Sequence, residues 1–298
     1  PQTLSLQEFR VRIGFTVNRF DWPGGSAAIR PNLLKAARIA EDGGLYSLWV
    51  MDHYWQIAVN GPAEDPMLEG YTTLGFLAAA TERVTLGTMV TGVTYRNPAI
   101  LAKIGTTLDV LSGGRAYYGI GAAWFEEEHA GYGVPFPPVK ERFERLEEAI
   151  RIANGMWSDS DAGFEGKHYT PNRLLNVPPA VSSPRPKLLI GGGGEQKTLR
   201  LVARYADACN LFDGGDEFVT HKLDVLRGHC ETEGRDYDAI EKTIMQRVTP
   251  ESTAKTVVTR AEQLRELGLT HMILAAPVPA DDHYLELAAE IASLTADL

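Results

Sequence analysis

The stretch KLLIGGGGEQKTLRLVARYADACNLF, residues 187–212, holds one complete strand–helix–strand unit. The apolar runs Lys187–Ile190 and Ala208–Phe212 are typical of buried strands, and Gln196–Tyr205 between them carries apolar residues at helical spacing. A helical crossover of this kind joins parallel strands. Residues 187–212 therefore predict a parallel sheet covered by helices.

The same alternation continues outward from this unit in both directions. Further strands are predicted at Val11–Val17, Leu45–Met51, Val84–Val90, Ala116–Gly121, Ile244–Val248 and His271–Ala275. Further helices are predicted at 31–43, 71–81, from Pro98 up to Gly113, 140–157, 217–232, 254–267 and 282–294. Eight strand–helix pairs in 298 residues favour a (β/α)8 TIM barrel over a doubly wound open sheet, which also alternates strands and helices.

We expect one barrel domain over residues 1–298, with insertions after the fourth strand and before the fifth. The second insertion covers residues 158–186, which hold several prolines and few periodic apolar residues. No apolar run is long enough for a membrane span or a secretory segment, so a soluble, cytoplasmic protein is expected.

The charge balance argues against a nucleic-acid partner. Lys and Arg number 29 against 39 Asp and Glu, a net charge of −10 without a basic stripe. An anionic ligand therefore needs a local cradle. Cys209 and Cys230 show neither metal spacing nor a disulfide framework, and a buried and a surface thiol are expected, respectively. The histidine spacing supports no metal site, and no G-x-S-x-G elbow indicates a hydrolase.

In a barrel, the active site forms at the carboxyl ends of the strands. Asp52 and His53 directly follow the second strand, in WVMDHYWQ. Such a pair can bind the polar edge of a ring and exchange a proton near neutral pH, although a turn aspartate beside a solvated histidine is the alternative.

Two more strand ends carry small and polar residues. After the third strand, Thr91–Pro98 (TGVTYRNP) offers close backbone approach at Gly92 and hydrogen bonds from Thr91 or Asn97, and it also starts a helix. After the fourth, Gly119–Trp124 lacks the third glycine of a dinucleotide fingerprint, but Trp124 can wall a ring pocket. The acidic run that follows, Glu126–Glu128 with His129, is either part of the site or a solvated helix start.

The four glycines Gly191–Gly194 separate a strand from a helix expected to begin near Glu195. Consecutive amides at a helix start can bind a phosphate without a positive side chain. The run lacks the ending of a P-loop, and a flexible turn is the alternative.

Taken together, these motifs resemble luciferase-like oxidoreductases of the actinobacterial type that use the deazaflavin coenzyme F420. The resemblance extends from about Phe15 to Asp238. It is carried by YSLWVMDH at 46–53, by residues 65–103 and 107–129, by GVPFPPVKERFERLEEAI at 133–150, and by residues 188–212.

The resemblance implies a TIM barrel that holds the coenzyme ring at its strand ends. It implies a non-prolyl cis peptide within Met89-Val90-Thr91 that supports the ring, with Asp52 and His53 beside it. The coenzyme-binding residues implied are Asp52, Val90, Thr91, Gly92, Gly121 and Arg142, together with Gly192, Gly193 and Gly194 at the phosphate. The expected substrate pocket is walled by Tyr54, Trp55 and Trp124.

Two departures limit what is carried over. Sugar-phosphate dehydrogenases of this superfamily have a catalytic glutamate where this chain has Trp124, so their substrate is not inherited. The FMN-binding pattern has a basic residue near Ala122, which favours F420, although Arg142 matches a second basic position.

The implied activity is hydride transfer between the deazaflavin C5 and a small organic substrate, by reduction of C=C, C=N or C=O or by alcohol oxidation. His53 and Asp52 are the expected catalytic residues, His53 as proton donor or acceptor and Asp52 orienting the ring. The alternatives are an FMN-dependent monooxygenase that uses oxygen and flavin from a partner reductase, and a non-catalytic ligand-binding barrel. The implied partners are a second copy of the chain and an F420-reducing dehydrogenase.

Overall fold

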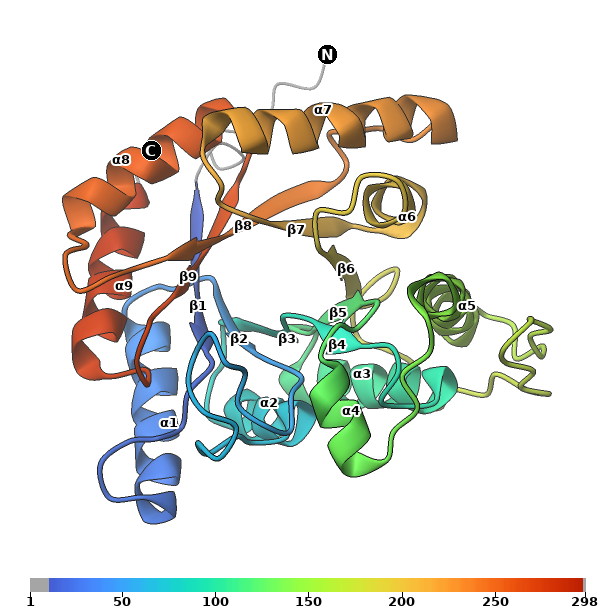
Figure 1. The fold of residues 1–298 in the computed structure, drawn as a ribbon, viewed down its shortest axis with the longest axis horizontal. Coiled ribbons are helices and arrows are strands. Elements are labelled where there is room, and N and C mark those ends of the chain that lie inside the picture. The colour runs from blue at the N-terminus through green and yellow to red at the C-terminus, as the bar shows by residue number, and fades with distance from the viewer. Residues whose placement is uncertain (1–10, 297–298) are drawn as a thin grey trace.

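The chain folds into a nearly closed barrel of parallel strands with helices around it (Figure 1). The computed structural model describes residues 11–296. Its strands are β1 Arg12–Val17, β2 Ser47–Val50, β3 Thr85–Thr88, β4 Thr91–Gly92, β5 Tyr117–Gly121, β6 Lys187–Gly191, β7 Ala208–Phe212, β8 Glu241–Arg247 and β9 His271–Ala275. They form one sheet in the order β3-β2-β1-β9-β8-β7-β6-β5-β4, and all the paired neighbours are parallel.

β3 lies within the predicted strand Val84–Val90, and β4 follows directly after that strand's predicted end. The two together occupy one strand position, so the sheet has eight strand positions. The interruption contains a cis peptide bond between Met89 and Val90, within the predicted stretch. A parallel bridge between Leu86 and Ala116 connects β3 to the start of β5 and brings the two edges of the sheet together. The predicted (β/α)8 TIM-barrel fold is thereby confirmed.

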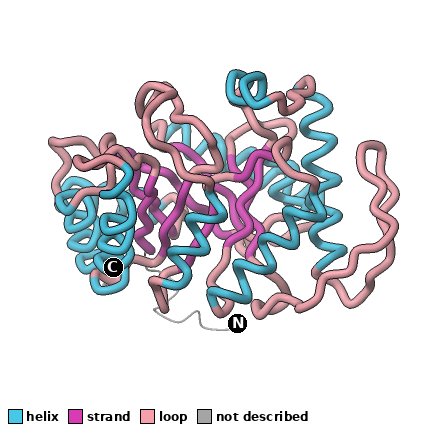
Figure 2. The backbone as a smooth tube through the Cα atoms, turned by 90° about the horizontal axis from the view of Figure 1, so that it is seen from below, coloured by secondary structure: helices cyan, strands magenta, loops and turns pink. Residues whose placement is uncertain are grey.

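The helices surround the strands on the outside (Figure 2). They are α1 Ser26–Asp42, α2 Gly70–Ala79, α3 Pro98–Ser112, α4 Glu126–Tyr132, α5 Val139–Met156, α6 Thr198–Tyr205, α7 Asp216–Glu233, α8 Ala254–Glu266 and α9 Asp282–Thr295. Residues between α5 and β6 extend outward from α5 as a long loop, pinned by one antiparallel bridge between Ala162 and Arg173 (Figures 1 and 2).

Helix α1 begins five residues before Pro31, where the sequence pattern placed its start. Pro31 lacks the N–H that would bond to the carbonyl of Ala27, but the helix continues through it. The side-chain amide of Asn32 donates to the carbonyl of Ala28 over 2.8 Å and supports this turn. Proline therefore marks the interior of this helix and not its first residue.

The buried side chains form two separate clusters. The larger lies between the strands and the helices, and the smaller consists of Trp49, Tyr117, Leu189, Ala208 and Ile273. The members of the smaller cluster all lie on strands, and their separation from the helix-facing core places them inside the barrel. The barrel is therefore a packed core and not a pore.

Both cysteines are buried, which corrects the expectation of a surface thiol at Cys230. Cys230 shares the buried face of α7 with Val219, Leu223 and Leu226. The charged neighbours of Cys230 in the sequence point away from this face.

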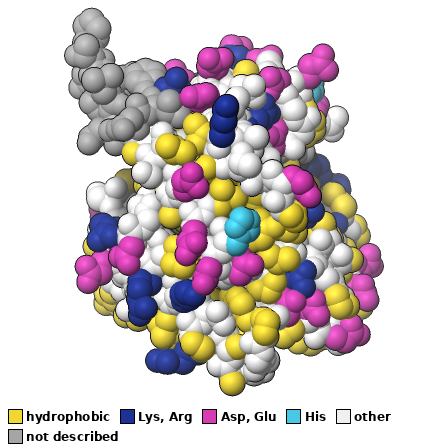
Figure 3. Space-filling view, turned by 90° about the vertical axis from the view of Figure 1, so that its left-hand side faces the viewer, with side chains coloured by type: hydrophobic (Ala, Val, Ile, Leu, Met, Phe, Trp, Pro, Cys, Tyr) yellow, Lys and Arg dark blue, Asp and Glu magenta, His cyan; other side chains and the backbone are white. Residues whose placement is uncertain are grey.

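The surface over α1, α8 and α9 carries acidic and basic side chains interspersed with apolar ones (Figure 3). This face shows no basic stripe, in agreement with the sequence. Within residues 11–296, no helix has the length and apolar content that a membrane span requires.

Candidate active site

A cleft opens at the carboxyl ends of the strands, with lining residues at or just after the ends of β2, β4, β5, β6, β7 and β8. It holds about 950 Å³ of empty space, including the part that is open to solvent. This position is that of a ligand site in a TIM barrel. The cleft brings together Asp52, His53, Val90, Thr91, Gly92, Gly121, Trp124 and Gly192 from the predicted site.

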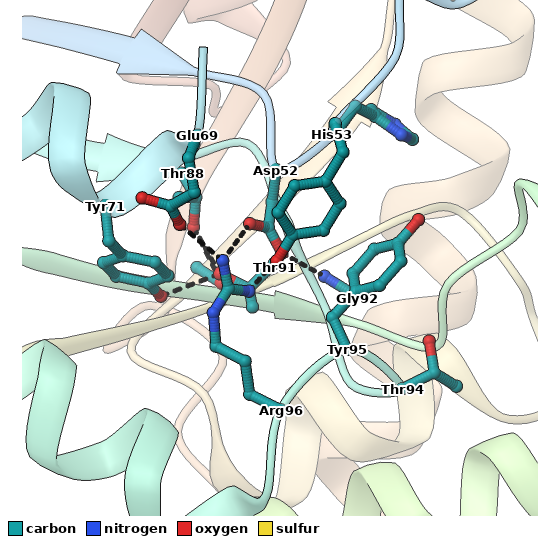
Figure 4. A network of polar contacts seen from close by, with 12 residues as sticks. Asp52, His53, Glu69, Tyr71, Thr88, Thr91, Gly92, Thr94, Tyr95 and Arg96 are labelled. Atoms are coloured by element: carbon teal, nitrogen blue, oxygen red, sulfur yellow. Dashed lines mark hydrogen bonds and ion pairs between the residues drawn. The ribbon is translucent and has the colours of Figure 1, made fainter. Parts of the chain in front are cut away.

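The buried carboxylate of Asp52 is held by an arginine that the sequence did not single out. The guanidinium of Arg96 donates to both oxygens of Asp52, over 2.8 and 2.9 Å, and to Glu69 over 2.6 Å (Figure 4). The N–H of Gly92 donates to Asp52 over 3.1 Å. Burial raises the pKa of Asp52, while the hydrogen bonds from Arg96 and Gly92 oppose that shift. Asp52 thus fixes the backbone just after the strand break.

A chain of hydroxyl groups supports the same break from behind. The Tyr71 hydroxyl lies 2.7 Å from the Thr91 hydroxyl, which lies 2.6 Å from that of Thr88 (Figure 4). Thr88 in turn donates to the carbonyl of Gly119 over 3.1 Å. These hydrogen bonds join β4 to the end of β3 through Thr91 and Thr88, and join β3 to β5 through Thr88 and Gly119.

Val90 lies between two glycines at the floor of the cleft. A Cβ atom on Gly121 would lie 2.8 Å from one methyl group of Val90, and a Cβ on Gly191 would lie 2.8 Å from the other. Both contacts are shorter than carbon atoms tolerate. The position of Val90 therefore depends on glycine at the ends of β5 and β6.

His53 is held by a buried carboxylate on α4. Its Nδ1 lies 3.2 Å from Oε2 of Glu128, which is fully buried and also accepts from the Tyr95 hydroxyl. The amides of Tyr54 and Trp55 donate to the other oxygen of Glu128. Burial disfavours the Glu128 carboxylate, but these hydrogen bonds outweigh it and hold the pKa of Glu128 below its usual value.

The other ring nitrogen of His53, Nε2, has no partner among residues 11–296. The ring lies edge-on to Trp124, with 5.5 Å between the centroids, and close to Phe125. His53 lines the cleft, so it offers a free proton-transfer atom there.

The glycine run forms the other end of the site. Gly192 has φ +108°, a conformation that only glycine adopts readily, and a Cβ on Gly194 would lie 2.8 Å from the Thr198 hydroxyl. In the described part of the chain, the N–H groups of Gly193 and Gly194 have no acceptor. Lys222 reaches the run from α7 and is paired with Glu195. Free amides, a hydroxyl and an ammonium group fit a phosphate.

Two details differ from the expected cradle. Helix α6 begins at Thr198, so Glu195–Lys197 form a turn between the glycines and the helix. The guanidinium of Arg142 donates to the carbonyls of Pro137, Ala122 and Ala123, and it supports the loop after β5 without lining the cleft.

Tyr54 and Trp55 also lie outside the cleft lining. Their rings pack edge-on against Tyr95 and Tyr132, respectively. Sequence reasoning left out several residues that the structure brings to the site, namely Arg96, Glu128, Asn210, Phe212, Lys222 and Met245. Only Glu128 carried a signal, as part of an acidic run after a barrel strand. Among the described residues, no cluster of His, Cys, Asp or Glu is able to hold a metal ion.

A cleft at the strand ends that is lined by an imidazole and bordered by unbonded glycine amides is typical of the active sites of TIM-barrel enzymes. Residues 12–295 match the family model described as luciferase-like monooxygenase, and the chain belongs to this family.

The relatives similar in sequence include F420-dependent glucose-6-phosphate dehydrogenases. An F420-dependent glucose-6-phosphate dehydrogenase from Kineococcus radiotolerans is 36% identical over 214 residues, which are 69% of this chain and 60% of the relative. The match thus spans less than two thirds of that relative's length.

Solved structures share the fold. An F420-dependent secondary alcohol dehydrogenase in complex with an F420-acetone adduct aligns with a TM-score of 0.81 at 18% identity, over 97% of this chain and 99% of its own. A monooxygenase from Streptomyces bottropensis aligns with a TM-score of 0.75 at 19% identity, over 96% of this chain and 98% of its own.

Proposed function

We propose that this protein is an F420-dependent oxidoreductase. The observation that carries the proposal is a single cleft with the free Nε2 of His53 among its lining groups and the glycine run at its edge. The F420-dependent relative at 36% identity supports the choice of coenzyme. So does the absence of lysine and arginine from the described residues that line the cleft, because the FMN pattern has a basic residue near Ala122.

The residues present fit the coenzyme. The amides of Gly193 and Gly194, the Thr198 hydroxyl and Lys222 would hold its phosphate, since they are the donors available at the glycine run. The backbone of Val90–Gly92 and of Gly121 would support its ring, because those glycines allow close approach. When bound, the deazaflavin supplies two-electron chemistry, giving or accepting a hydride at C5.

His53 is the group that moves the proton. The Glu128 carboxylate accepts from Nδ1, so Nδ1 carries the hydrogen, and Nε2 of this cleft-lining residue has no partner in the described chain. From Nε2, His53 would protonate the oxygen or nitrogen of a substrate undergoing reduction, and would remove that proton in the reverse direction. The oxygens of Asp52 are already engaged by Arg96 and Gly92, so Asp52 would act by positioning the backbone that supports the ring.

Titration of the purified protein with F420 and, separately, with FMN tests this proposal through the quenching of tryptophan fluorescence. We expect saturable binding of F420, and of its phosphate-free analogue only much more weakly, because the glycine run would lose its ligand. Tight binding of FMN without binding of F420 would instead favour the FMN-dependent monooxygenase.

A further inference from the structure

We propose that the second reactant is an uncharged aromatic or alicyclic compound whose only polar group is the carbonyl or hydroxyl that reacts. This inference rests on the proposed function and names its substrate class. It departs from the sugar phosphate named for the Kineococcus relative.

The cleft offers no cation to an anionic substrate. Lysine and arginine are absent from its lining in the described chain. Arg96 binds Asp52 and Glu69, and Arg142 binds backbone carbonyls. Lys222 lies at the glycine run, where it pairs with Glu195 and would hold the coenzyme phosphate. A carboxylate or phosphate placed beside the buried Asp52 would lose its hydration without gaining a counter-charge.

Free hydrogen-bonding groups are scarce near His53. The lining side chains of Asp52, Thr91 and Tyr95 already bond to other protein groups. Thr198 lies at the glycine run, and Asn210 accepts from Thr243 over 2.9 Å, which leaves only the side-chain NH2 of Asn210 available to a ligand. A polyol would leave most of its hydroxyl groups unpaired here, whereas a single carbonyl or hydroxyl is satisfied by Nε2 of His53.

The mouth of the cleft carries two large exposed aromatic side chains. Trp124 after β5 is 61% exposed and Phe212 at the end of β7 is 60% exposed, yet both line the cleft. Trp124 stacks on Phe125 with 5.2 Å between centroids and touches the edge of the His53 ring. This is an apolar platform next to the His53 imidazole, and a ring compound seated on it would cover surface that is otherwise exposed to water.

Three probes separate charge from shape. Acetophenone is an uncharged aromatic ketone, 4-acetylbenzoate adds one remote carboxylate to it, and glucose 6-phosphate is a charged polyol. We would measure their binding to the F420-loaded protein by saturation-transfer-difference NMR and calorimetry, and their reduction or oxidation by the absorbance of the coenzyme. We expect acetophenone to bind at least about tenfold more tightly than 4-acetylbenzoate, and glucose 6-phosphate not to bind.

Variants at the mouth test the platform. Trp124→Ala and Phe212→Ala should each weaken acetophenone binding several-fold without changing the affinity for F420. Leu111→Ala, which removes an equally exposed apolar side chain at the far end of α3, is the matched control and should change neither. Phe212→Arg should shift the preference toward 4-acetylbenzoate by supplying the missing cation.

The outcomes separate this inference from the proposed function. Binding of F420 together with a preference for glucose 6-phosphate would overturn the substrate class and leave the coenzyme assignment standing. Unchanged acetophenone binding in both alanine variants would also overturn it. Failure to bind F420 in the titration would remove the proposed function itself.

Discussion

The Nδ1 atom of His53 lies 3.2 Å from Oε2 of Glu128, although 75 residues separate them in the chain. The same carboxylate accepts from the amides of Tyr54 and Trp55 and from the Tyr95 hydroxyl. Glu128 therefore ties the loops after β2 and β4 to α4 and selects which nitrogen of His53 carries the proton.

Replacing Glu128 by Gln should lower kcat by roughly 10–100-fold while F420 affinity changes little, because the amide cannot accept from every donor now bonded to the carboxylate. The ¹⁵N shifts of His53 should change from a single Nδ1–H tautomer to a mixture, and the pH profile of kcat should move. Glu127→Gln changes the exposed neighbour and is the control. A normal tautomer and pH profile in Glu128→Gln would leave Glu128 a purely structural role.

Gly191→Ala should weaken F420 binding by about tenfold or more, because the new Cβ would lie 2.8 Å from Val90 and push this side chain toward the cleft. Adding Val90→Ala should recover part of the loss, and calorimetry on the four proteins of the double-mutant cycle measures the coupling. Gly228→Ala, on α7 with open space around it, should be neutral or slightly stabilising. Additive losses would mean that Val90 and Gly191 act independently.

Neither thiol should react with a thiol reagent in the native protein. Cys209 and Cys230 are both buried, and burial raises the pKa of Cys209 to about 12 and raises that of Cys230. Two equivalents should react after unfolding in urea. Rapid labelling of one thiol in the folded protein would contradict this prediction and would support the surface thiol expected from the sequence.

The stability of the fold should fall as the pH decreases below about 6.5, the pKa of an unfolded histidine. Burial lowers the pKa of His271, although Glu241 accepts from its ring. Below this pH, His271 is therefore protonated in the unfolded chain but not in the folded chain. The free energy of unfolding then decreases by up to about 1.4 kcal/mol per pH unit, until the pH reaches the pKa of His271 in the folded protein.

Urea unfolding at pH 8, 6.5 and 5.5 measures this loss, and His271→Gln should show a shallower slope over the same range. If that variant does not fold, NMR of the histidine-labelled unmodified protein measures the titration of His271 directly. A native His271 resonance that titrates near pH 6.5 would contradict the prediction.

Strand positions were predictable from the sequence because strands buried on both faces are continuous apolar runs. β7 and β9 match their predicted bounds, and the cis bond lies within the predicted stretch. The predicted start of α1 at Pro31 was wrong, because the helix begins at Ser26 and tolerates Pro31 in its interior. Hydrophobic periodicity shows which face of a helix is buried, but it does not show a side-chain hydrogen bond such as the one from Asn32 that supports the turn at Pro31.

From the sequence, a site residue could be predicted only where it directly follows a predicted strand. Asp52, His53 and Gly192 meet in one cleft for that reason. Arg96 and Glu128 reach it through contacts with distant segments, which leave no local pattern. Arg142 was expected at the ligand, but its position on α5 turns its guanidinium toward backbone carbonyls.

The break between β3 and β4 and the glycine run present backbone atoms to the cleft, whereas the mouth presents the side chains of Trp124 and Phe212. Mutation alters side chains far more easily than it alters a backbone path. Substitutions at Trp124, in the loop after β5, and at Phe212, the last residue of β7, should therefore change which reactant the cleft accepts without disturbing the backbone that would bind the coenzyme. These two positions are the natural pair to randomise in directed evolution.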